Sequence, residues 1–248
     1  MIHNIEKYIV IMGSQKEVGH FTIHGTGFLI SIKGKAYVVT CRHVVMNMRK
    51  HDVKFVIPNP KRTLTIPTAL LLSEPVYYNL NEPYIDMCLM NLPEYSSSVL
   101  CTNGINTIDL DSLEETTNAS TGDKLISYGY PGCVTSKYLS ENNPIMPVPV
   151  TVIHSTATNW IMGEESFSPQ NTEGIISYDS KSIQLTYTES DLSNIEGISG
   201  GPVLQKETGL LCGIATSGRI DQQLPNNKIG SIFNITPISF LIDMIRLL

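Results

Sequence analysis

The stretch Gly197-Ile198-Ser199-Gly200-Gly201-Pro202 surrounds one serine with three glycines, directly before the apolar pair Val203-Leu204. Glycine adopts backbone angles that other residues avoid, so a Gly-x-Ser turn can expose the hydroxyl and point successive N–H groups at one place. A nucleophilic serine with an oxyanion hole needs that arrangement. A plain turn between two strands has the same composition, so the stretch by itself leaves both interpretations open.

The positions of the histidines restrict the folds in which Ser199 could be a nucleophile. In the α/β-hydrolase fold the serine comes first and the histidine last. Here all six histidines precede the serine: His3, His20, His24, His43, His51 and His154. This order excludes the α/β-hydrolase fold and favours an order in which a histidine is followed by an aspartate and then by the serine.

His43 and Asp86 fit the histidine and the aspartate of that order. His43 follows the β-branched run 36–40, and Asp86 stands in the apolar run 85–90. A carboxylate among apolar neighbours is costly to bury without a partner, and the Nδ1–H of a histidine is a suitable one. Each residue alone is better explained as a core, turn or cap residue. All three in this order predict a catalytic triad of His43, Asp86 and Ser199.

The composition is that of a globular protein without a basic surface. A chain of 248 residues with 42% hydrophobic residues can bury a sizeable core. The net charge of −6 gives no reason to expect binding to nucleic acid or to an anionic membrane. We see neither a signal peptide nor an apolar run long enough to span a membrane. The five cysteines show neither zinc spacing nor a disulfide framework, so we expect a cytoplasmic, reducing setting.

Short apolar runs separated by turn residues predict an all-β protein. They fall into two sets of about six, so we expect two six-stranded antiparallel β-barrels. Residues 1–100 would carry His43 and Asp86, residues 101–122 would connect the barrels, and residues 123–248 would carry Ser199.

The last residues, 237–248, have apolar residues at helical spacing and predict a short C-terminal α-helix. Thr236 can cap this helix, and Pro237 suits its first position. We expect the helix to pack on the second barrel. A surface helix for a partner or a membrane is the alternative, which the lack of a basic polar face disfavours.

The chain resembles the trypsin/chymotrypsin-fold serine proteases, most closely the compact bacterial branch that includes the HtrA (Deg) proteases. The resemblance spans most of the chain and rests on Gly25-Thr26-Gly27-Phe28-Leu29-Ile30, Val38-Val39-Thr40-Cys41-Arg42-His43-Val44-Val45, Ile85-Asp86-Met87-Cys88-Leu89, residues 122–132, Gly197 to Pro202 and Phe233-Asn234-Ile235-Thr236-Pro237. It implies a serine endopeptidase that forms an acyl-enzyme. The N–H groups of Gly197 and Ser199 would hold the oxyanion, and substrate backbone would pair with Thr216-Ser217-Gly218.

This sequence departs from that family at three points. Ile198 stands where members that are activated by proteolysis carry an aspartate, so activation by that ion pair is not expected. No segment of PDZ size follows the protease part, so we expect no PDZ domain. The resemblance also places Cys41 near the catalytic histidine, but no second cysteine is evident to pair with it.

The specificity pocket is the least defined part of the predicted site. By its spacing before the nucleophile, the resemblance puts the pocket floor at Ser193, with Thr216 and Gly218 in the lining. An uncharged floor favours a neutral P1 residue, because a basic side chain would lose hydration without gaining a partner. A shift of the loop 189–196 by two residues would instead place Asp191 at the pocket floor. Asp191 or Glu196 would then be the counter-charge for a basic P1 residue.

Two further function classes stay open beside the peptidase. One is an inactive trypsin-like fold that serves as a binding or regulatory module, and the other is an ester hydrolase. We expect a protein or peptide substrate and no cofactor, and a regulatory partner is compatible with the sequence. We also expect no metal site, because His20 and His24 share a strand face but lack a third ligand.

Overall fold

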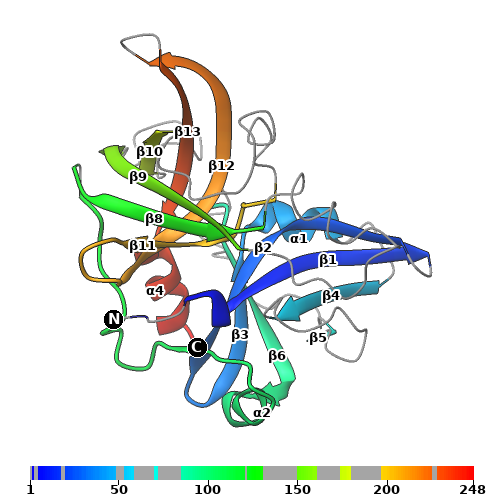
Figure 1. The fold of residues 1–248 in the computed structure, drawn as a ribbon. Helices are drawn as coiled ribbons and strands as arrows, with labels where there is room; N and C mark the ends of the chain where they lie inside the picture. The colour runs from blue at the N-terminus through cyan, green and yellow to red at the C-terminus, as the bar shows by residue number, and fades with distance from the viewer. Residues whose placement is uncertain are drawn as a thin grey trace.

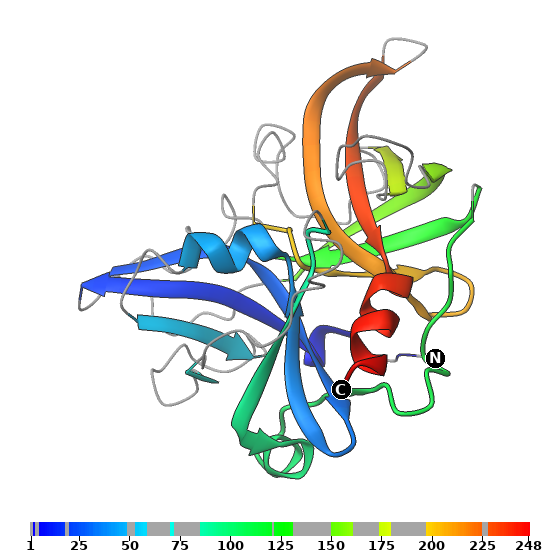
Figure 2. The ribbon, with the colours of Figure 1, turned by 180° about the vertical axis from the view of Figure 1, so that it is seen from behind.

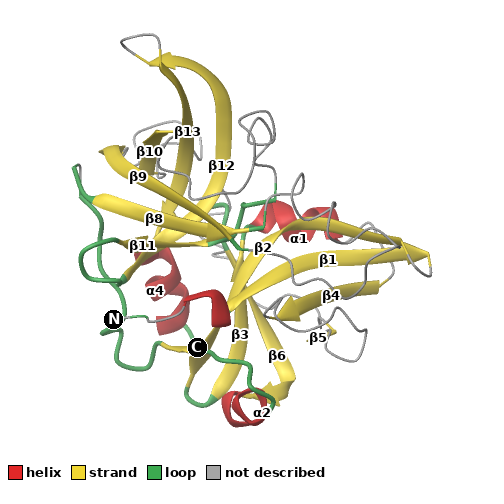
Figure 3. Cartoon of the chain, in the orientation of Figure 1, coloured by secondary structure: helices red, strands yellow, loops and turns green. Residues whose placement is uncertain are grey.

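The computed structural model describes residues 2, 5–17, 20–48, 53–58, 70–71, 85–120, 122–130, 150–160, 174–179, 197–224 and 228–248. These residues form mostly antiparallel β-structure with a few short helices (Figure 3). The strands gather in two groups, which occupy different parts of the molecule in both ribbon views (Figures 1 and 2). The all-β prediction with a short C-terminal helix is therefore confirmed.

The first group is a seven-stranded sheet. Its strands are β1 (Ile9–Glu17), β2 (His20–Ile32), β3 (Lys35–Thr40), β4 (Val53–Pro58), β5 (Leu70–Leu71), β6 (Cys88–Ser96) and β7 (Ile108–Asp109). Neighbours follow the order β5-β4-β1-β2-β3-β6, and the short β7 pairs in parallel with β2. The expectation of six wholly antiparallel strands is corrected by β7, which the polar composition around it did not indicate.

The hairpin of β2 and β3 is the part of this sheet that positions the site. Lys33 and Gly34 turn the chain with φ of 49° and 75°, angles that suit glycine. All residues of β3 after Lys35 are buried, as the continuous apolar run predicts. At the far end of the hairpin, Thr40 pairs with Gly27 of β2 and with Cys88 of β6.

The second group contains β8 (Lys124–Gly129), β9 (Thr151–Trp160), β10 (Gly174–Asp179), β11 (Pro202–Gln205), β12 (Leu211–Leu224) and β13 (Lys228–Pro237). Its pairing order, β10-β13-β12-β11-β8-β9, closes because β9 also pairs with β10. The predicted strand at residues 183–188 lies outside the described residues. β11 follows the Ser199 turn directly, so the nucleophile stretch enters the wall of this closed set.

The described helices are all short. Besides the 3-10 turn η1 (Ile5–Lys7), the helices are α1 (Arg42–Met48), α2 (Ser97–Thr102) and α4 (Ile238–Arg246). α2 and β7 occupy part of the polar region 101–122, which was expected to be only a connection. Among the described residues, no helix combines the length and the apolar character that crossing a membrane would require.

The start of α4 differs from the expected cap. Pro237 is the N-cap residue, with no side-chain hydrogen bond, and the helix begins at Ile238. Thr236 is buried in β13, and its hydroxyl has no hydrogen-bond partner among the described residues. Thr236 therefore belongs to β13, where it pairs with Ile214, and its side chain does not cap the helix.

One apolar cluster spans both groups of strands and α4, and a smaller one lies within the second group. The larger cluster joins first-sheet residues such as Phe28 and Leu89 to Ile238 and Leu241 of the helix. The smaller cluster fills the second group and includes Leu125, Ala157, Ile198, Val203, Cys212, Ala215 and Ile235. Helix α4 lies below the second group and beside the first in both ribbon views, and it contacts β12 and β13 (Figures 1 and 2). The interface between the groups is thereby held by apolar packing.

Candidate active site

His43 and Asp86 come from two neighbouring segments of the first sheet. β3 ends at Thr40, and β6 begins at Cys88, which is the pairing partner of Thr40. His43 lies in the first turn of α1, just past β3, and Asp86 lies just before β6. The strand pairing therefore brings the histidine and the aspartate together, although the sequence pattern predicted no helix at His43.

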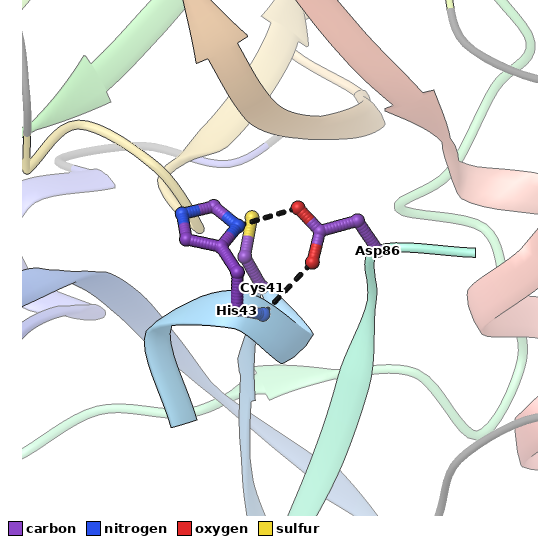
Figure 4. A group of neighbouring side chains, drawn as sticks. All are labelled: Cys41, His43 and Asp86. Atoms are coloured by element: carbon purple, nitrogen blue, oxygen red, sulfur yellow. Dashed lines mark hydrogen bonds and ion pairs between the residues drawn. The ribbon is translucent and has the colours of Figure 1, made fainter. Parts of the chain in front are cut away.

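The Asp86 carboxylate accepts two hydrogen bonds from His43. The backbone N–H of His43 donates to Oδ1 at 2.9 Å, and Nδ1 lies 2.5 Å from Oδ2. Figure 4 shows the carboxylate facing both groups, with the other ring nitrogen pointing away. The side chains of His43 and Asp86 are 44% and 23% exposed, so solvent and substrate can reach the ring. With the proton on Nδ1, Nε2 is the nitrogen that can accept a proton.

Ser199 lies in a turn that leads into β11. The N–H of Gly201 donates to the carbonyl of Ile198 at 2.9 Å, and Gly197 and Gly200 have φ of 102° and 90°. Residues with a Cβ rarely adopt such angles, so the glycines determine the shape of this turn. Ile198 is buried in the core of the second group, where it anchors the turn by apolar packing.

Thr26 of β2 holds the Ser199 turn from the first sheet. Its N–H donates to the carbonyl of Ser199 at 2.8 Å, and its hydroxyl donates to the carbonyl of Gly197 at 2.7 Å. The same hydroxyl accepts the N–H of Tyr130 at 2.9 Å. The carbonyl of Thr26 in turn accepts the hydroxyl of Thr40 at 2.6 Å. One buried threonine therefore links the histidine-bearing hairpin to the serine turn.

The glycines after Ser199 allow this turn to pack against backbone. A Cβ at Gly200 would lie 2.1 Å from the carbonyl oxygen of Thr26, and a Cβ at Gly201 would lie 1.9 Å from that of Tyr128. Neither carbonyl belongs to a flexible side chain, so a larger residue would displace the turn. Close approach is therefore the reason for glycine here, in addition to backbone angle.

The functional groups of Ser199 are partly engaged. Its hydroxyl donates to the carbonyl of Thr216 in β12 at 3.0 Å. Within the described part of the chain, no hydrogen bond joins it to His43, and the N–H groups of Gly197 and Ser199 donate to no other group. In the described structure the Ser199 hydroxyl is therefore bonded to β12 and not to the His43 ring.

The residues predicted to bind substrate are described only in part. Thr216, Ser217 and Gly218 lie in β12, where Ser217 and Gly218 pair with β13, and Thr216 is buried. The predicted pocket floor, Ser193, lies outside the described residues, as do the alternatives Asp191 and Glu196. The specificity prediction therefore stays a prediction.

The described cysteines form no disulfide with one another. Cys41, Cys88 and Cys212 are buried, and Cys101 is exposed. Burial, with a smaller contribution from the charge of Asp123, raises the pKa of the Cys212 thiol far above its ordinary value. Cys41 differs in its surroundings: its Sγ–H donates to the carbonyl of Ala215 at 3.3 Å, beside His43 and Asp86.

Thr26, Thr40 and Cys41 were not identified as contributors to the site from the residue pattern. The glycines on either side of Thr26 indicated a close approach of backbone, and the structure shows it: a Cβ at Gly25 would lie 2.9 Å from the carbonyl oxygen of Ser199. The partner in that approach lies more than 170 residues away, so local pattern could not name it. The resemblance placed Cys41 near His43, as the structure has it, but it assigned no contact to Thr40 and did not indicate the bond from Cys41 to Ala215.

Comparison with known proteins identifies the family. Residues 25–214 match the family model described as trypsin-like peptidase domain. A search of curated proteins finds no significant match. The solved structure described as "Structure of GrC" is 17% identical with a TM-score of 0.59, covering 98% of this chain and 94% of that chain. At this identity the likeness concerns the fold alone.

A second solved structure is less similar. It comes from work described as "Aromatic interactions drive the coupled folding and binding of the intrinsically disordered Sesbania mosaic virus VPg protein". That match is 12% identical with a TM-score of 0.48, covers 95% of this chain and 87% of that chain, and supports no further conclusion. The family model, by contrast, spans most of the chain, from the glycine-flanked Thr26 to β12. Since it also contains the His43, Asp86 and Ser199 segments, the chain belongs to the trypsin-like peptidase domain family.

Proposed function

We propose that the protein is a serine endopeptidase that cleaves peptide bonds through His43, Asp86 and Ser199. The observation that carries this proposal is the pair of hydrogen bonds from His43 to the Asp86 carboxylate. They orient the ring and keep a proton on Nδ1, which is the state required of a general base for a serine. Membership of the trypsin-like peptidase domain family supports the same activity.

The proposed reaction is acyl transfer. The Ser199 hydroxyl leaves the Thr216 carbonyl, gives its proton to Nε2 of His43, and its oxygen attacks the substrate carbonyl. The N–H groups of Gly197 and Ser199 donate to the resulting oxyanion. His43 then returns the proton to the leaving amine, and water releases the acyl group by the same route in reverse.

The proposal also covers the domain arrangement, the binding of substrate and the cellular setting. We propose two barrels, residues 1–100 and 123–248 joined by 101–122, in an HtrA-like arrangement. The edge at Thr216, Ser217 and Gly218 would take substrate backbone by strand addition. A neutral P1 residue is preferred in this proposal, and a P1-varied peptide library tests it, with cleavage after Arg or Lys as the contrary result. We also propose a reducing, cytoplasmic setting, on the cysteine spacing of the sequence.

A specific observation favours a second candidate function, a binding module. The Ser199 hydroxyl donates to Thr216 rather than to His43, which is the arrangement expected if the triad is not used. A serine-directed phosphonate distinguishes the two, because only an activated Ser199 becomes covalently labelled. Turnover of esters without turnover of peptides would instead support a non-peptide hydrolase.

The decisive experiment compares the wild-type chain with Ser199→Ala in a proteome-derived peptide mixture. We expect new peptide termini with the wild type and none above background with the variant. Matched thermal unfolding of the two proteins ensures that the loss is chemical. Equal sets of termini from both proteins would refute the proposed role of Ser199.

A further inference from the structure

Three side chains with different donor atoms converge beside the proposed active site. The thiol of Cys41, a ring nitrogen of His43 and a carboxylate oxygen of Asp86 all lie within 4.8 Å of one another. Figure 4 shows them as one cluster, with the sulfur close to the ring nitrogen that faces the carboxylate. That nitrogen is Nδ1, which lies 2.5 Å from Oδ2 of Asp86.

This donor set matches the chemistry of zinc. Zn²⁺ binds thiolate, imidazole and carboxylate ligands, commonly in a tetrahedral arrangement with water in an open position. Bond lengths of about 2.3 Å to sulfur and about 2.0 Å to nitrogen place these ligands roughly 3.5 Å apart at a tetrahedral angle. To bind one ion, the sulfur would have to approach by about 1 Å at most, and Nδ1 and Oδ2, now 2.5 Å apart, would have to separate to roughly 3.3 Å. The partly exposed side chains of His43 and Asp86 permit these shifts.

We infer that Cys41, His43 and Asp86 bind a zinc ion, and that this ion inhibits the protein by occupying Nδ1 of His43. The inhibitory part rests on the proposed peptidase function, whereas the binding part does not. The expectation of no metal site considered only the two histidines at positions 20 and 24. It missed this cluster because residues 41 and 43 lie close together in sequence but the third ligand lies far along the chain.

Zinc binding would reverse the protonation of the histidine ring. Nδ1 offers its lone pair to the ion, so the ring proton moves through solvent from Nδ1 to Nε2. The Cys41 thiol gives up one proton to solvent as the sulfur–zinc bond forms. A thiolate, a carboxylate and a neutral imidazole balance the double charge of the ion. His43 then carries a proton on Nε2, where the Ser199 proton would have to be accepted, and it cannot act as the base.

The structure limits the cost of breaking the hydrogen bond from Cys41 to Ala215. The Ala215 carbonyl accepts the Sγ–H of Cys41 at 3.3 Å, and it also accepts the N–H of Gly200 at 2.6 Å. If the thiol turns toward the ion, this buried carbonyl keeps its bond to Gly200 and is not left unsatisfied. Water can enter over His43, whose side chain is 44% exposed.

Cobalt binding tests the site without relying on peptidase activity. Titration of Ser199→Ala with Co²⁺ should produce the near-ultraviolet absorption of a thiolate-to-cobalt charge transfer, and Zn²⁺ should displace it. Adding Cys41→Ala should abolish this band. The matched control is Cys101→Ser, which removes the exposed cysteine on α2 and should leave the band intact.

Circular dichroism shows whether Cys41→Ala folds. If it does not fold, a second variant tests the site. His43→Ala alters an exposed position and should weaken cobalt binding by at least about 10- to 100-fold, because loss of a residue that merely supports a ligand already costs that much. Absence of the band from the Ser199→Ala protein, or its persistence in folded Cys41→Ala, would overturn the site. So would unchanged cobalt affinity in His43→Ala.

The inhibitory part is tested by peptide turnover with and without Zn²⁺. Each variant is compared with itself, so changes in basal rate cancel. We expect zinc to stop the wild type and Cys101→Ser, a chelator to restore them, and Cys41→Ala to need at least tenfold more zinc. Equal zinc sensitivity of Cys41→Ala would overturn the inference. A cobalt band in a protein that cleaves nothing supports the site and contradicts only the peptidase proposal.

Discussion

The His43–Asp86 pair and the Ser199 turn are held in place in different ways. The pair forms within one sheet, because the end of β3 is paired with the start of β6, and it is partly exposed. The Ser199 turn lies between the two groups of strands, where it is bonded to Thr26 of one and packed through Ile198 into the other. The acid–base pair thus depends on local strand pairing, whereas the nucleophile depends on how the two groups fit together.

This contrast predicts which changes affect chemistry alone and which also affect the fold. The His43 side chain is largely exposed, so its removal should leave packing intact. Changes around the serine turn should reduce stability and activity together, because backbone from both groups meets there. The following predictions test this difference, beginning with the largest expected effect.

Removal of the nucleophile or the base should have the largest effect. Ser199→Ala and His43→Ala should each lower turnover by about 10⁶, and the double variant should be little worse than either single one, because triad members act as a unit. Peptide turnover together with thermal unfolding measures both quantities. Additive losses would show that the two residues do not act on the same step.

Asp86→Asn should follow, with a loss of about 10⁴ in turnover. The amide cannot hold the Nδ1–H tautomer, while its similar shape keeps the hydrogen bond from the His43 backbone N–H. We expect the melting temperature to change far less than the rate. A variant with most of its activity would remove Asp86 from the catalytic machinery.

Gly201→Ala should affect the fold as well as the rate. The added Cβ would lie 1.9 Å from the Tyr128 carbonyl oxygen, so the turn must move away from β8. We expect a loss of about 1–3 kcal/mol in the free energy of unfolding and about 10² in turnover, because the nucleophile is misplaced. Gly34→Ala is the control: it strains a hairpin at φ 75° but meets no atom, so turnover should be retained. Equal rates for the two variants would contradict the role of close packing.

Thr26→Val should have a smaller effect on the rate. It keeps the side-chain shape but removes the hydroxyl that bonds Gly197 and Tyr130, at a cost of about 1–3 kcal/mol in unfolding free energy. The Gly197–Ile198 peptide, which lies between the two N–H groups of the proposed oxyanion hole, then loses this bond, so kcat should fall more than KM rises. Thr40→Val, which breaks only the bond to the Thr26 carbonyl, is the matched comparison. A kcat equal to that of Thr40→Val would show that the Gly197 contact has no influence on catalysis.

Ser96→Ala should be the mildest change and should leave activity untouched. Ser96 caps α2 by accepting the N–H of Val99, so its loss should cost about 1 kcal/mol in unfolding free energy. Denaturant unfolding measures this cost. A change in turnover would show that α2 is coupled to the site, against the separation described above.

Local sequence pattern predicted the strands near the site and the order of the proposed triad residues. The apolar run that became β3 is buried along nearly its whole length, and the glycines around Ser199 adopt the angles that suggested a tight turn. Such features depend on residues within a few positions of each other, so they can be inferred without a partner. The same reasoning failed at Thr236, because a local capping preference was overridden by strand pairing in β13.

The sequence by itself determined that a histidine, an aspartate and a glycine-flanked serine occur in that order, each beside a buried strand. Only the tertiary structure decided what surrounds them. Thr26 reaches Gly197 across 171 positions of the chain, and Cys41 reaches Ala215 across 174. Contacts of this kind arise when two separately paired groups of strands pack together, and no local periodicity encodes the partner. Strand pairing within each group, which joins residues far apart in sequence, likewise brings Asp86 to the Cys41–His43 segment and the Ser199 hydroxyl to the Thr216 carbonyl.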